Sequence, residues 1–481
     1  MASIKKDTIN GMFWSAVEKF SNQGIRFLIG LILARLLTPS DFGIIAMLGV
    51  FFAISNSFID SGFGTALIRK PERKEEDYTT VFIFNVVISL LIYGILFVAA
   101  PWVGRFFNTP ILCSILRVQA LCLVLGALMV VLDAKLTIDL NFKAIAQRSL
   151  LSSVISGVVA IVLAYMGWGV WSLVYQAIVF SLVNLIFVWL YCRWKPKLVF
   201  SWISFKELGA FGSRLLVAGL LNTIYTKLTP LAIAKFYTAQ DLGYYNRGAE
   251  FARIPRDVSL GIFQKVTLPV FSKIQNDENH LISVYRKYIK VTSMIMIFFC
   301  MLLAALSHPV ILVLLTDKWV DSVIFLQLFC FAAMFDHLNT INLNLLKVKG
   351  RSDLYLRLEV CKKIVATLIL FAAIPFGVIA ICVSKIIYTQ VAIIFNTYYT
   401  GKFYHVGYFS QFKDFLPYFF TSLIACVPAY VITFAHIPHI AMILGGMVSS
   451  VWIYYLLLRK DDLMIEVLDV IKVKTRNLWK K

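Results

Sequence analysis

The chain has 481 residues, of which 60% are hydrophobic and only 15% are charged, and its mean hydropathy is +0.80. Water-soluble domains carry about 45–50% apolar and about 25% charged residues, so a soluble chain of this composition would expose apolar patches that aggregate. The formal net charge of +20 would indicate nucleic-acid binding in a soluble protein. Here the basic residues stand in short loops between apolar runs, so the composition predicts a polytopic membrane protein instead.

Apolar runs recur along the whole chain at the length of about 20 residues that crosses a bilayer core as a helix. Fourteen spans are predicted, near residues 12–34, 42–66, 79–100, 111–132, 149–166, 170–191, 209–234, 243–263, 288–307, 321–346, 356–375, 377–399, 415–434 and 439–458. The span 243–263 carries the most charged residues of the set. These runs predict an all-α fold of about 14 transmembrane helices.

Lysine and arginine are concentrated in alternate loops. With the N-terminus in the cytoplasm, the cytoplasmic segments hold 31 basic residues and the outer loops hold 4, which are Arg35, Arg105, Lys235 and Lys318. Basic residues gather on the cytoplasmic side of membrane proteins, so this bias predicts that both termini are cytoplasmic. The mixed-charge tail from Arg459 onward is expected to be an interfacial helix that is attracted to anionic membrane lipids.

One stretch of the chain, Leu31–Ile45, recurs in similar form as Leu231–Tyr245, with five of fifteen residues identical. In both copies an apolar run ends at a basic residue, and a Thr-x-x-Asp-x-Gly turn begins a second run. The aspartate can cap the new helix, and the glycine can relieve its first turn. Because the flanking hydropathy repeats too, we expect helices 1–6 in residues 1–200, helices 7–12 in residues 201–400, and helices 13 and 14 with the basic tail in residues 401–481. Six is an even number, so the two halves would share one orientation, as in transporters built from parallel repeats.

Polar residues inside the spans follow helical spacing. An unpaired charge at the bilayer centre costs about 2.5–3.5 kcal/mol on insertion scales, so such residues must face the protein interior or water. Three spans carry them along or beside one face: span one has Ser15, Glu18, Asn22 and Arg26, span seven has Arg214, Asn222 and Lys227, and span eight has Arg247, Glu250, Arg253, Arg256 and Asp257.

Cations outnumber carboxylates in these three spans, even with Lys19 left aside. The cations are Arg26, Arg214, Lys227, Arg247, Arg253 and Arg256, and the carboxylates are Glu18, Glu250 and Asp257. One interpretation is a water-filled cavity between the halves that binds an anion, because guanidinium groups bind phosphate oxygens in a bidentate manner. Its cations would be Arg26, Lys227, Arg253 and Arg256. The alternative is pairing within the protein, such as Glu250 with Arg253 or Arg247, which only lowers the cost of insertion. The excess of cations requires a further counter-charge, which favours an anionic ligand.

Three carboxylates and a histidine inside the spans are candidates for binding a coupling ion, H⁺ or Na⁺. They are Glu18, Asp60, Asp336 and His337. The histidine is in a position more typical of a core residue whose hydrogen bonds are satisfied. The sequence contains no nucleotide-binding loop, metal-type cysteine spacing or catalytic triad. We therefore expect a transporter without a cofactor, and not an enzyme.

Two motifs carry a resemblance to a known family. ARLLTPSDFGIIAM (Ala34–Met47) follows the first span, and KGRSDLYLRLEVCKK (Lys349–Lys363) leads into the eleventh. With the plan of six, six and two spans, the whole chain resembles the Wzx-type polysaccharide flippases. These form the polysaccharide-transport branch, whose members export lipopolysaccharide, colanic acid and teichuronic acid, of the multidrug/oligosaccharidyl-lipid/polysaccharide exporter (MOP) superfamily. The resemblance implies the MATE-like transporter fold of that superfamily.

The resemblance also implies a function. An undecaprenyl-diphosphate-linked oligosaccharide repeat unit would be moved across the bacterial inner membrane by alternating access, for the synthesis of O-antigen, capsule or exopolysaccharide. Arg26 and either Arg253 or Arg256 match the placement of cavity cations in related lipid-diphosphate flippases. Asn22 and Asn222 would then bond to sugar or phosphate, and the polymerase and chain-length proteins of the same pathway are candidate partners.

Two other functions stay open from the sequence. An ion-coupled multidrug or cation antiporter of the same fold would need an acidic cavity, whereas the surplus here is basic. A membrane-embedded glycosyltransferase or glycan polymerase would need a sizeable outer loop with catalytic acids, and every outer loop is predicted to be short.

Overall fold

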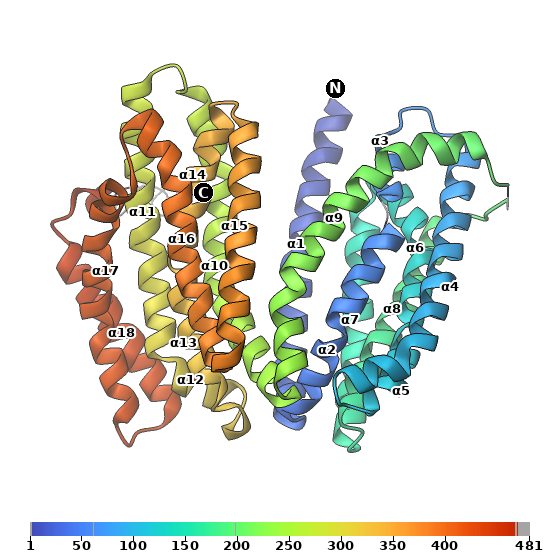
Figure 1. The fold of residues 1–481 in the computed structure, drawn as a ribbon, viewed down its shortest axis with the longest axis horizontal. Coiled ribbons are helices and arrows are strands. Elements are labelled where there is room, and N and C mark those ends of the chain that lie inside the picture. Colours follow the sequence, from blue (N-terminus) through green and yellow to red (C-terminus); the bar gives the residue numbers. More distant parts are fainter. Residues whose placement is uncertain (1, 61, 198, 467–468, 470–481) are drawn as a thin grey trace. The chain divides into compact units, whose positions relative to one another are not determined.

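The structure is a computed structural model that describes residues 2–60, 62–197, 199–466 and 469 (Figure 1). Their backbone forms helices joined by short turns, with no strand in these ranges. The chain folds into two compact units, Met1–Gly243 and Tyr244–Lys481, each of which is taken by itself below. The division into repeats at residues 200 and 400 stays a prediction. The expected tail helix falls largely outside the described residues.

The first unit is helical throughout its described residues, apart from the connections between helices. They are α1 (Ala2–Leu36), α2 (Pro39–Asp60), α3 (Phe63–Arg69), α4 (Glu75–Phe106), α5 (Ile111–Gln119), α6 (Leu121–Ile138), α7 (Phe142–Tyr165), α8 (Val170–Cys192) and α9 (Trp202–Phe236). Helix α10 (Ala239–Lys273) begins in this unit and continues in the second.

The second unit is also helical throughout its described residues. Its further helices are α11 (Glu278–Ala305), α12 (Ser307–Leu314), α13 (Ser322–Ala333), α14 (Asp336–Val348), α15 (Ser352–Ala373), α16 (Val378–Tyr404), α17 (Tyr408–Val431) and α18 (His439–Leu458). Single 3₁₀ turns at Asp317–Trp319, Ile374–Phe376 and Ile432–Phe434 complete the connections.

Eleven helical segments of the described chain are long and apolar enough to cross a membrane. Each coincides with one of the predicted spans. The three other predicted spans coincide with α1, α10 and α15, which are long helices that carry several charged residues. The chain is therefore an all-α polytopic membrane protein, as its composition predicts.

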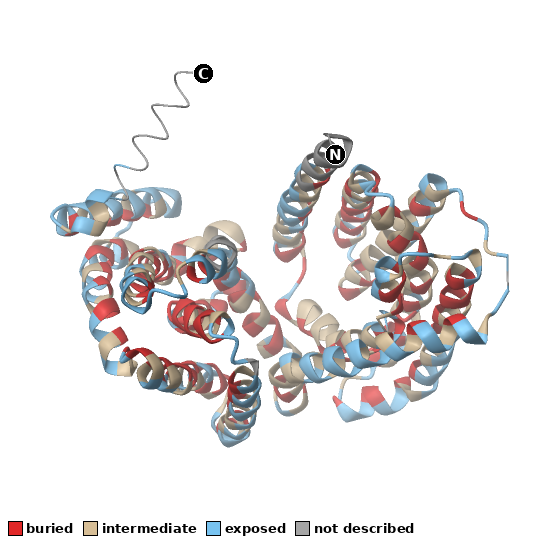
Figure 2. Ribbon diagram, turned by 90° about the horizontal axis from the view of Figure 1, so that it is seen from above, coloured by how far each residue is buried: buried red, intermediate tan, exposed pale blue. Residues whose placement is uncertain are grey.

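Apolar side chains from neighbouring helices form the core of the first unit. Leu67 of α3, Val81 of α4, Leu132 of α6 and Val188 of α8 are completely buried together. Figure 2 shows such buried residues on the faces where helices meet, with exposed residues on the outer faces. Helix α1 packs closely on α7, because a Cβ atom at Gly157 would lie 2.1 Å from the Ile29 side chain. Small residues of this kind let membrane helices approach one another.

The repeated Thr-x-x-Asp turn has the same hydrogen bonds in both copies. The Thr38 amide donates to the Asp41 carboxylate at 2.9 Å, and the Asp41 amide donates to the Thr38 hydroxyl at 3.3 Å. The Thr238 and Asp241 pair repeats both bonds at 3.1 Å. This is a capping box, in which the threonine is the N-cap and the aspartate stands three positions later. The prediction that the aspartate is the cap is therefore corrected: the threonine is the cap, and the aspartate completes it.

The glycine of each turn marks a close contact between the two copies. A Cβ atom at Gly43 would lie 1.6 Å from the Ala239 carbonyl oxygen, and one at Gly243 would lie 2.0 Å from the Pro39 carbonyl oxygen. No side chain fits at these distances. The glycines therefore serve the mutual packing of the two turns, and not the relief of the first helical turn that the sequence suggested.

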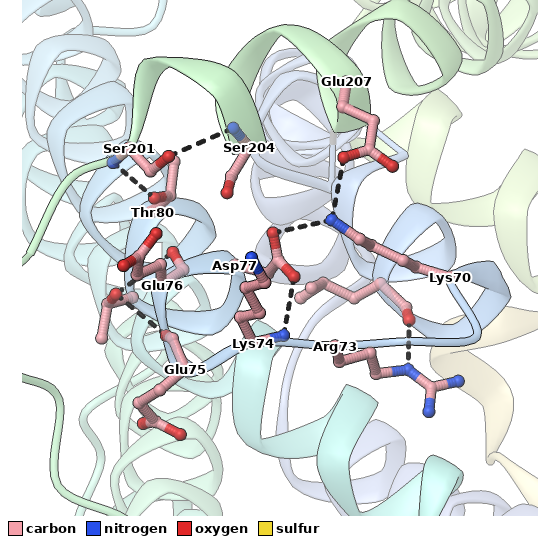
Figure 3. A network of polar contacts seen from close by, with 12 residues as sticks. Lys70, Arg73, Lys74, Glu75, Glu76, Asp77, Thr80, Ser201, Ser204 and Glu207 are labelled. Atoms are coloured by element: carbon pink, nitrogen blue, oxygen red, sulfur yellow. Dashed lines mark hydrogen bonds and ion pairs between the residues drawn. The ribbon is translucent and has the colours of Figure 1, made fainter.

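A polar network ties the start of α9 to the turn between α3 and α4 (Figure 3). The Lys70 ammonium donates to Asp77 at 3.0 Å and to Glu207 of α9 at 2.8 Å. The hydrogen bond to Glu207 raises the pKa of Lys70. The Ser201 amide, just before α9, donates to the Thr80 hydroxyl at 2.9 Å. These bonds hold the first turns of α9 against α3 and α4.

A buried hydrogen-bond network holds four helices of the second unit together. The Asn342 side-chain oxygen accepts from the Tyr285 hydroxyl at 2.8 Å and from the Thr400 hydroxyl at 3.0 Å. The Asn342 amide nitrogen donates to Gln411 at 2.9 Å. Satisfied polar networks of this kind fix the packing of helices whose surroundings are apolar.

Candidate functional site

Four polar residues are predicted along one face of α1, and they are called the α1 stripe below: Ser15, Glu18, Asn22 and Arg26. Asn22 and Arg26 of this stripe lie in two different environments. Asn22 is buried against α7, where its amide nitrogen donates to the Ser149 hydroxyl and its side-chain oxygen accepts from Ser153 at 2.6 Å. Both polar ends of the Asn22 side chain are thus used to join α1 to α7. Arg26, one turn further along, is exposed, and its guanidinium lies 5.0 Å from the centre of the Phe180 ring of α8. That is a cation–π contact, which leaves the charge without a carboxylate partner in the described part of the chain.

An ion pair that the sequence analysis missed lies beside this stripe. Arg148 of α7 is buried, and its guanidinium pairs with the Asp133 carboxylate of α6. The predicted spans end at residue 132 and begin again at residue 149, which leaves both residues in a loop. The structure extends both helices past these points. Glu18 and Asp60 are near enough to interact electrostatically with Asp133.

A signal for this pair was present in the sequence. Arg148, Ser152 and Ser156 are spaced by four residues and lie on one buried face of α7. The Arg148 nitrogens Nε and Nη1 have no hydrogen-bond partner among the described residues. A single carboxylate therefore compensates the buried guanidinium only partly.

The middle of α9 is largely uncovered by the other helices of the first unit. Arg214 and Asn222 are exposed, and Lys227 is half-buried. Their side chains form no hydrogen bond or ion pair with another described residue. Helix α9 is nevertheless anchored near them, because the Thr223 hydroxyl lies 3.2 Å from the Ser57 hydroxyl of α2. The cations of α9 thus resemble Arg26 in lacking an acidic neighbour.

The cations of α10 have carboxylate partners. Arg247 is buried and donates to Glu250 at 2.7 Å. Arg253 lies 3.6 Å from Asp257, and Arg256 lies 3.7 Å from the same carboxylate. On this helix the structure therefore shows ion pairs within the protein, which is the alternative to anion binding. Of the two partners considered for Glu250, it is Arg247 that pairs with it.

The candidate ion-coupling residues of the second unit also have partners. Asp336, the first residue of α14, accepts a hydrogen bond from the Arg256 guanidinium. His337 is completely buried, and its Nε2 lies 2.8 Å from the Ser293 hydroxyl. The histidine is thus buried with Nε2 bonded, whereas its Nδ1 has no hydrogen-bond partner among the described residues. Lys385 of α16 interacts electrostatically with Asp336 and Arg256, and its ammonium lies 4.8 Å from the centre of the Phe329 ring.

Three predicted cations therefore remain without a carboxylate partner in the described chain, all on helices of the first unit. They are Arg26, Arg214 and Lys227. Positive charges on membrane helices are stable when they face water or an anion. Guanidinium and ammonium groups placed in this way can bind phosphate oxygens, by a bidentate fork and by a point charge respectively.

By sequence, the chain is similar to a protein family and to two named proteins. A family model described as polysaccharide biosynthesis protein matches residues 32–324. The chain is 28% identical over 314 residues to the succinoglycan biosynthesis transport protein ExoT of Rhizobium meliloti (strain 1021). That alignment covers 65% of this chain and 64% of ExoT, slightly less than two thirds of the relative's length. The chain is 26% identical over 381 residues to the lipopolysaccharide biosynthesis protein WzxC of Escherichia coli (strain K12), covering 78% of this chain and 76% of WzxC.

Two solved structures share the fold. The lipid II flippase MurJ in an inward closed conformation matches with a TM-score of 0.72 at 15% identity, over 93% of this chain and 99% of MurJ. An inward-facing multidrug resistance MATE family transporter of the MOP superfamily matches with a TM-score of 0.56 at 16% identity, over 79% of this chain and 95% of the transporter. The likeness concerns the fold, and it confirms the MOP-type transporter fold that the sequence motifs imply.

Proposed function

The chain belongs to the polysaccharide biosynthesis protein family, and we propose that it is a flippase for a lipid-linked oligosaccharide in the bacterial inner membrane. The transport and lipopolysaccharide biosynthesis names of ExoT and WzxC, and the flippase fold of MurJ, support this proposal. The substrate would be an undecaprenyl-diphosphate-linked repeat unit, moved from the cytoplasmic to the outer leaflet. Both termini would be cytoplasmic, as the distribution of basic residues predicts.

One observation carries the chemical part of the proposal. Arg26, Arg214 and Lys227 stand on membrane helices without a carboxylate partner in the described chain. A diphosphate supplies the negative charge that these cations lack, and a charged hydrogen bond contributes about 1.5–3 kcal/mol. Arg253 would take part only by exchanging its carboxylate partner Asp257 for the substrate, and Arg256 only by releasing Asp336 and Asp257.

The two asparagines of the predicted site differ in what they offer a substrate. Asn222 is exposed on α9 and would bond to sugar or phosphate. Asn22 is engaged with Ser149 and Ser153, so its contribution would be to hold the α1 stripe in place. Coupling to H⁺ or Na⁺ would draw on Glu18 and Asp60, which neighbour the Asp133 and Arg148 pair. The polymerase and chain-length proteins of the pathway would receive the flipped unit.

The first experiment asks which leaflet holds the substrate. In a host strain that lacks this gene, complete diphosphate-linked repeat units should accumulate on the cytoplasmic leaflet, and surface polymer should be lost. Restoring the wild-type gene should reverse both effects. Normal surface glycans without an accumulated intermediate would contradict flipping, and a drug-efflux assay of the overexpressed protein would then test the antiporter alternative.

The residue assignment is tested in the same strain. Arg26→Gln and Lys227→Gln should lower export by about ten-fold or more each, the change that loss of one charged hydrogen bond produces. Arg105→Gln, which removes an exposed arginine at the end of α4, is the matched control and should export normally. Full export by both the Arg26 and the Lys227 variant at normal protein levels would refute the assignment without refuting the flippase proposal.

A further inference from the structure

A groove on the second unit lies outside the site described above. Helices α15 and α16 and the start of α17 border a cavity of about 600 Å³. This volume is within the range of about 300–1,000 Å³ that ligand pockets occupy. Several of its lining residues are exposed on the surface of the unit, among them Arg357, Cys361, Ile394 and Tyr398.

The groove is polar at one end and apolar at the other. Helices α15 and α16 run antiparallel, since the short turn Ile374–Phe376 connects them. Arg357 and Tyr399 each lie five residues from the ends of their helices at Ser352 and Tyr404, so they stand at the same level. Cys361 and Phe395 lie about 6 Å deeper, at 1.5 Å per helical residue. A guanidinium and tyrosine hydroxyls thus mark the outer end of the groove, and apolar side chains line its inner end.

Two glycines close the polar end. A Cβ atom at Gly401 of α16 would lie 3.1 Å from the Cα atom of Gly407, just before α17. Both glycines line the groove, together with Tyr408. The chain therefore crosses over the end of α16 at close range, and this crossing gives the groove a fixed outer wall.

Arg357 lacks a hydrogen-bond or ion-pair partner within the described chain. The acidic residues nearest to it on α15 are engaged elsewhere: Asp353 accepts two hydrogen bonds from Arg351, at 2.8 and 2.9 Å, and Glu359 pairs with Lys362. The Arg351 guanidinium holds the pKa of Asp353 at about 2, so this carboxylate stays charged and paired with it. The groove therefore presents one uncompensated positive charge at its polar end.

We propose that this groove binds one anionic phospholipid, with its phosphate at Arg357 and an acyl chain in the apolar part between α15 and α16. A single guanidinium matches the net charge of a lipid such as phosphatidylglycerol, whose phosphodiester has no ammonium group of its own, and the bilayer supplies such lipids at high local concentration. Because α15 begins at the end that the basic loops place in the cytoplasm, the lipid comes from the cytoplasmic leaflet. Tyr399 and Tyr408 are the kind of amphipathic side chains that lie at headgroup level.

The test measures lipid retention by the purified full chain. Native mass spectrometry after addition of phosphatidylglycerol, phosphatidylethanolamine or undecaprenyl diphosphate reports which lipid stays bound. We expect one phosphatidylglycerol per chain, and about five-fold weaker binding in Arg357→Gln, the fold-change for one basic residue acting on an anionic lipid. Lys413→Gln, which removes an exposed lysine of α17 that does not line the groove, should bind phosphatidylglycerol as the wild type does.

A second variant probes the apolar end without touching the charge. Cys361→Phe fills the inner part of the groove and should also weaken phosphatidylglycerol binding, while the elution profile and thermal midpoint show that the chain is folded. Equal binding of phosphatidylglycerol by wild type, Arg357→Gln and Cys361→Phe would overturn the proposal, as would equal binding of phosphatidylethanolamine. Binding of undecaprenyl diphosphate alone at an Arg357-dependent site would also overturn it. That last outcome would assign the groove to the transported lipid and leave the proposed flipping intact.

Discussion

The contact between the two repeated turns makes a sharp prediction for Gly43. A Cβ atom at this position would lie 1.6 Å from the Ala239 carbonyl oxygen and 2.5 Å from its carbonyl carbon. Both are backbone atoms, so no change of rotamer relieves the clash, and the start of α10 must move away from α2. Overpacking in a core costs about 1–3 kcal/mol, and a clash with backbone belongs at the upper end of that range. We therefore expect Gly43→Ala to destabilise the protein by about 3 kcal/mol.

The control for this prediction stands on the same helix. Gly49 lies six residues along α2, and a Cβ atom there would meet nothing within 4 Å. Replacing a helical glycine by alanine in open space stabilises a helix by about 0.5–1 kcal/mol, so Gly49→Ala should be neutral or slightly stabilising. Comparing the two substitutions separates the close contact from the general effect of removing a glycine.

The assay is the thermal unfolding of the purified protein in detergent, followed by tryptophan fluorescence. For a unit of about 150–250 residues, 1 kcal/mol shifts Tm by about 2–4 °C, so Gly43→Ala should lower Tm by roughly 6–12 °C. Gly243→Ala should act similarly, because its Cβ would lie 2.0 Å from the Pro39 carbonyl oxygen. The double variant should cost less than the sum, since one displacement relieves both clashes. An unchanged Tm for Gly43→Ala, or an equal loss for Gly49→Ala, would refute the reasoning.

Three further predictions follow from the contacts described. Thr38→Ala removes the N-cap of α2 and should cost about 1 kcal/mol in the same unfolding assay, whereas Thr38→Ser should keep most of the stability. Asp133→Ala leaves the buried Arg148 guanidinium uncompensated and should cost about 3–5 kcal/mol, seen as a low yield of folded protein; a Tm equal to that of wild type would show that water or lipid reaches the guanidinium. Asp77→Ala removes the acceptor for Lys70 and for the Lys74 amide, and should cost about 1–3 kcal/mol. Glu207→Gln, at the exposed end of the same network, should change Tm by less than half as much.

Local features of the chain were predictable from sequence because each is encoded within one helix or one turn. Apolar runs of membrane length located every long helix, and the repeated Thr-x-x-Asp-x-Gly pattern identified two turns of the same geometry. The individual roles of the threonine, the aspartate and the glycine in these turns were less predictable. The aspartate and threonine share the capping bonds, and the purpose of Gly43 depends on Ala239, which lies 196 positions away in the chain.

The pairing of charges between helices was not predictable, because helical spacing shows which residues share a face but not what lies opposite that face. Arg256 pairs with Asp336, 80 residues away, whereas the sequence pattern suggests anion binding for the arginine and ion coupling for the aspartate. Asp133 and Arg148 were hidden for a related reason. Helix ends are the least certain part of a sequence-based assignment, and a shift of six or seven residues moved both groups from a loop into the membrane helices.

The ion pairs indicate which helices could bind an anion without losing an existing carboxylate partner. The three arginines of α10 that were candidates for anion binding are balanced by three carboxylates. Glu250 and Asp257 of the same helix and Asp336 of α14 form ion pairs with them. A substrate phosphate that bound there would have to displace an existing carboxylate, and the exchange of one ion pair for another yields little net free energy. On α1 and α9 no such exchange is needed, because Arg26 and Lys227 have no carboxylate to lose within the described chain. The first contacts with a diphosphate should therefore be made by α1 and α9, and charge removal at Arg26 should weaken export more than charge removal at Arg253.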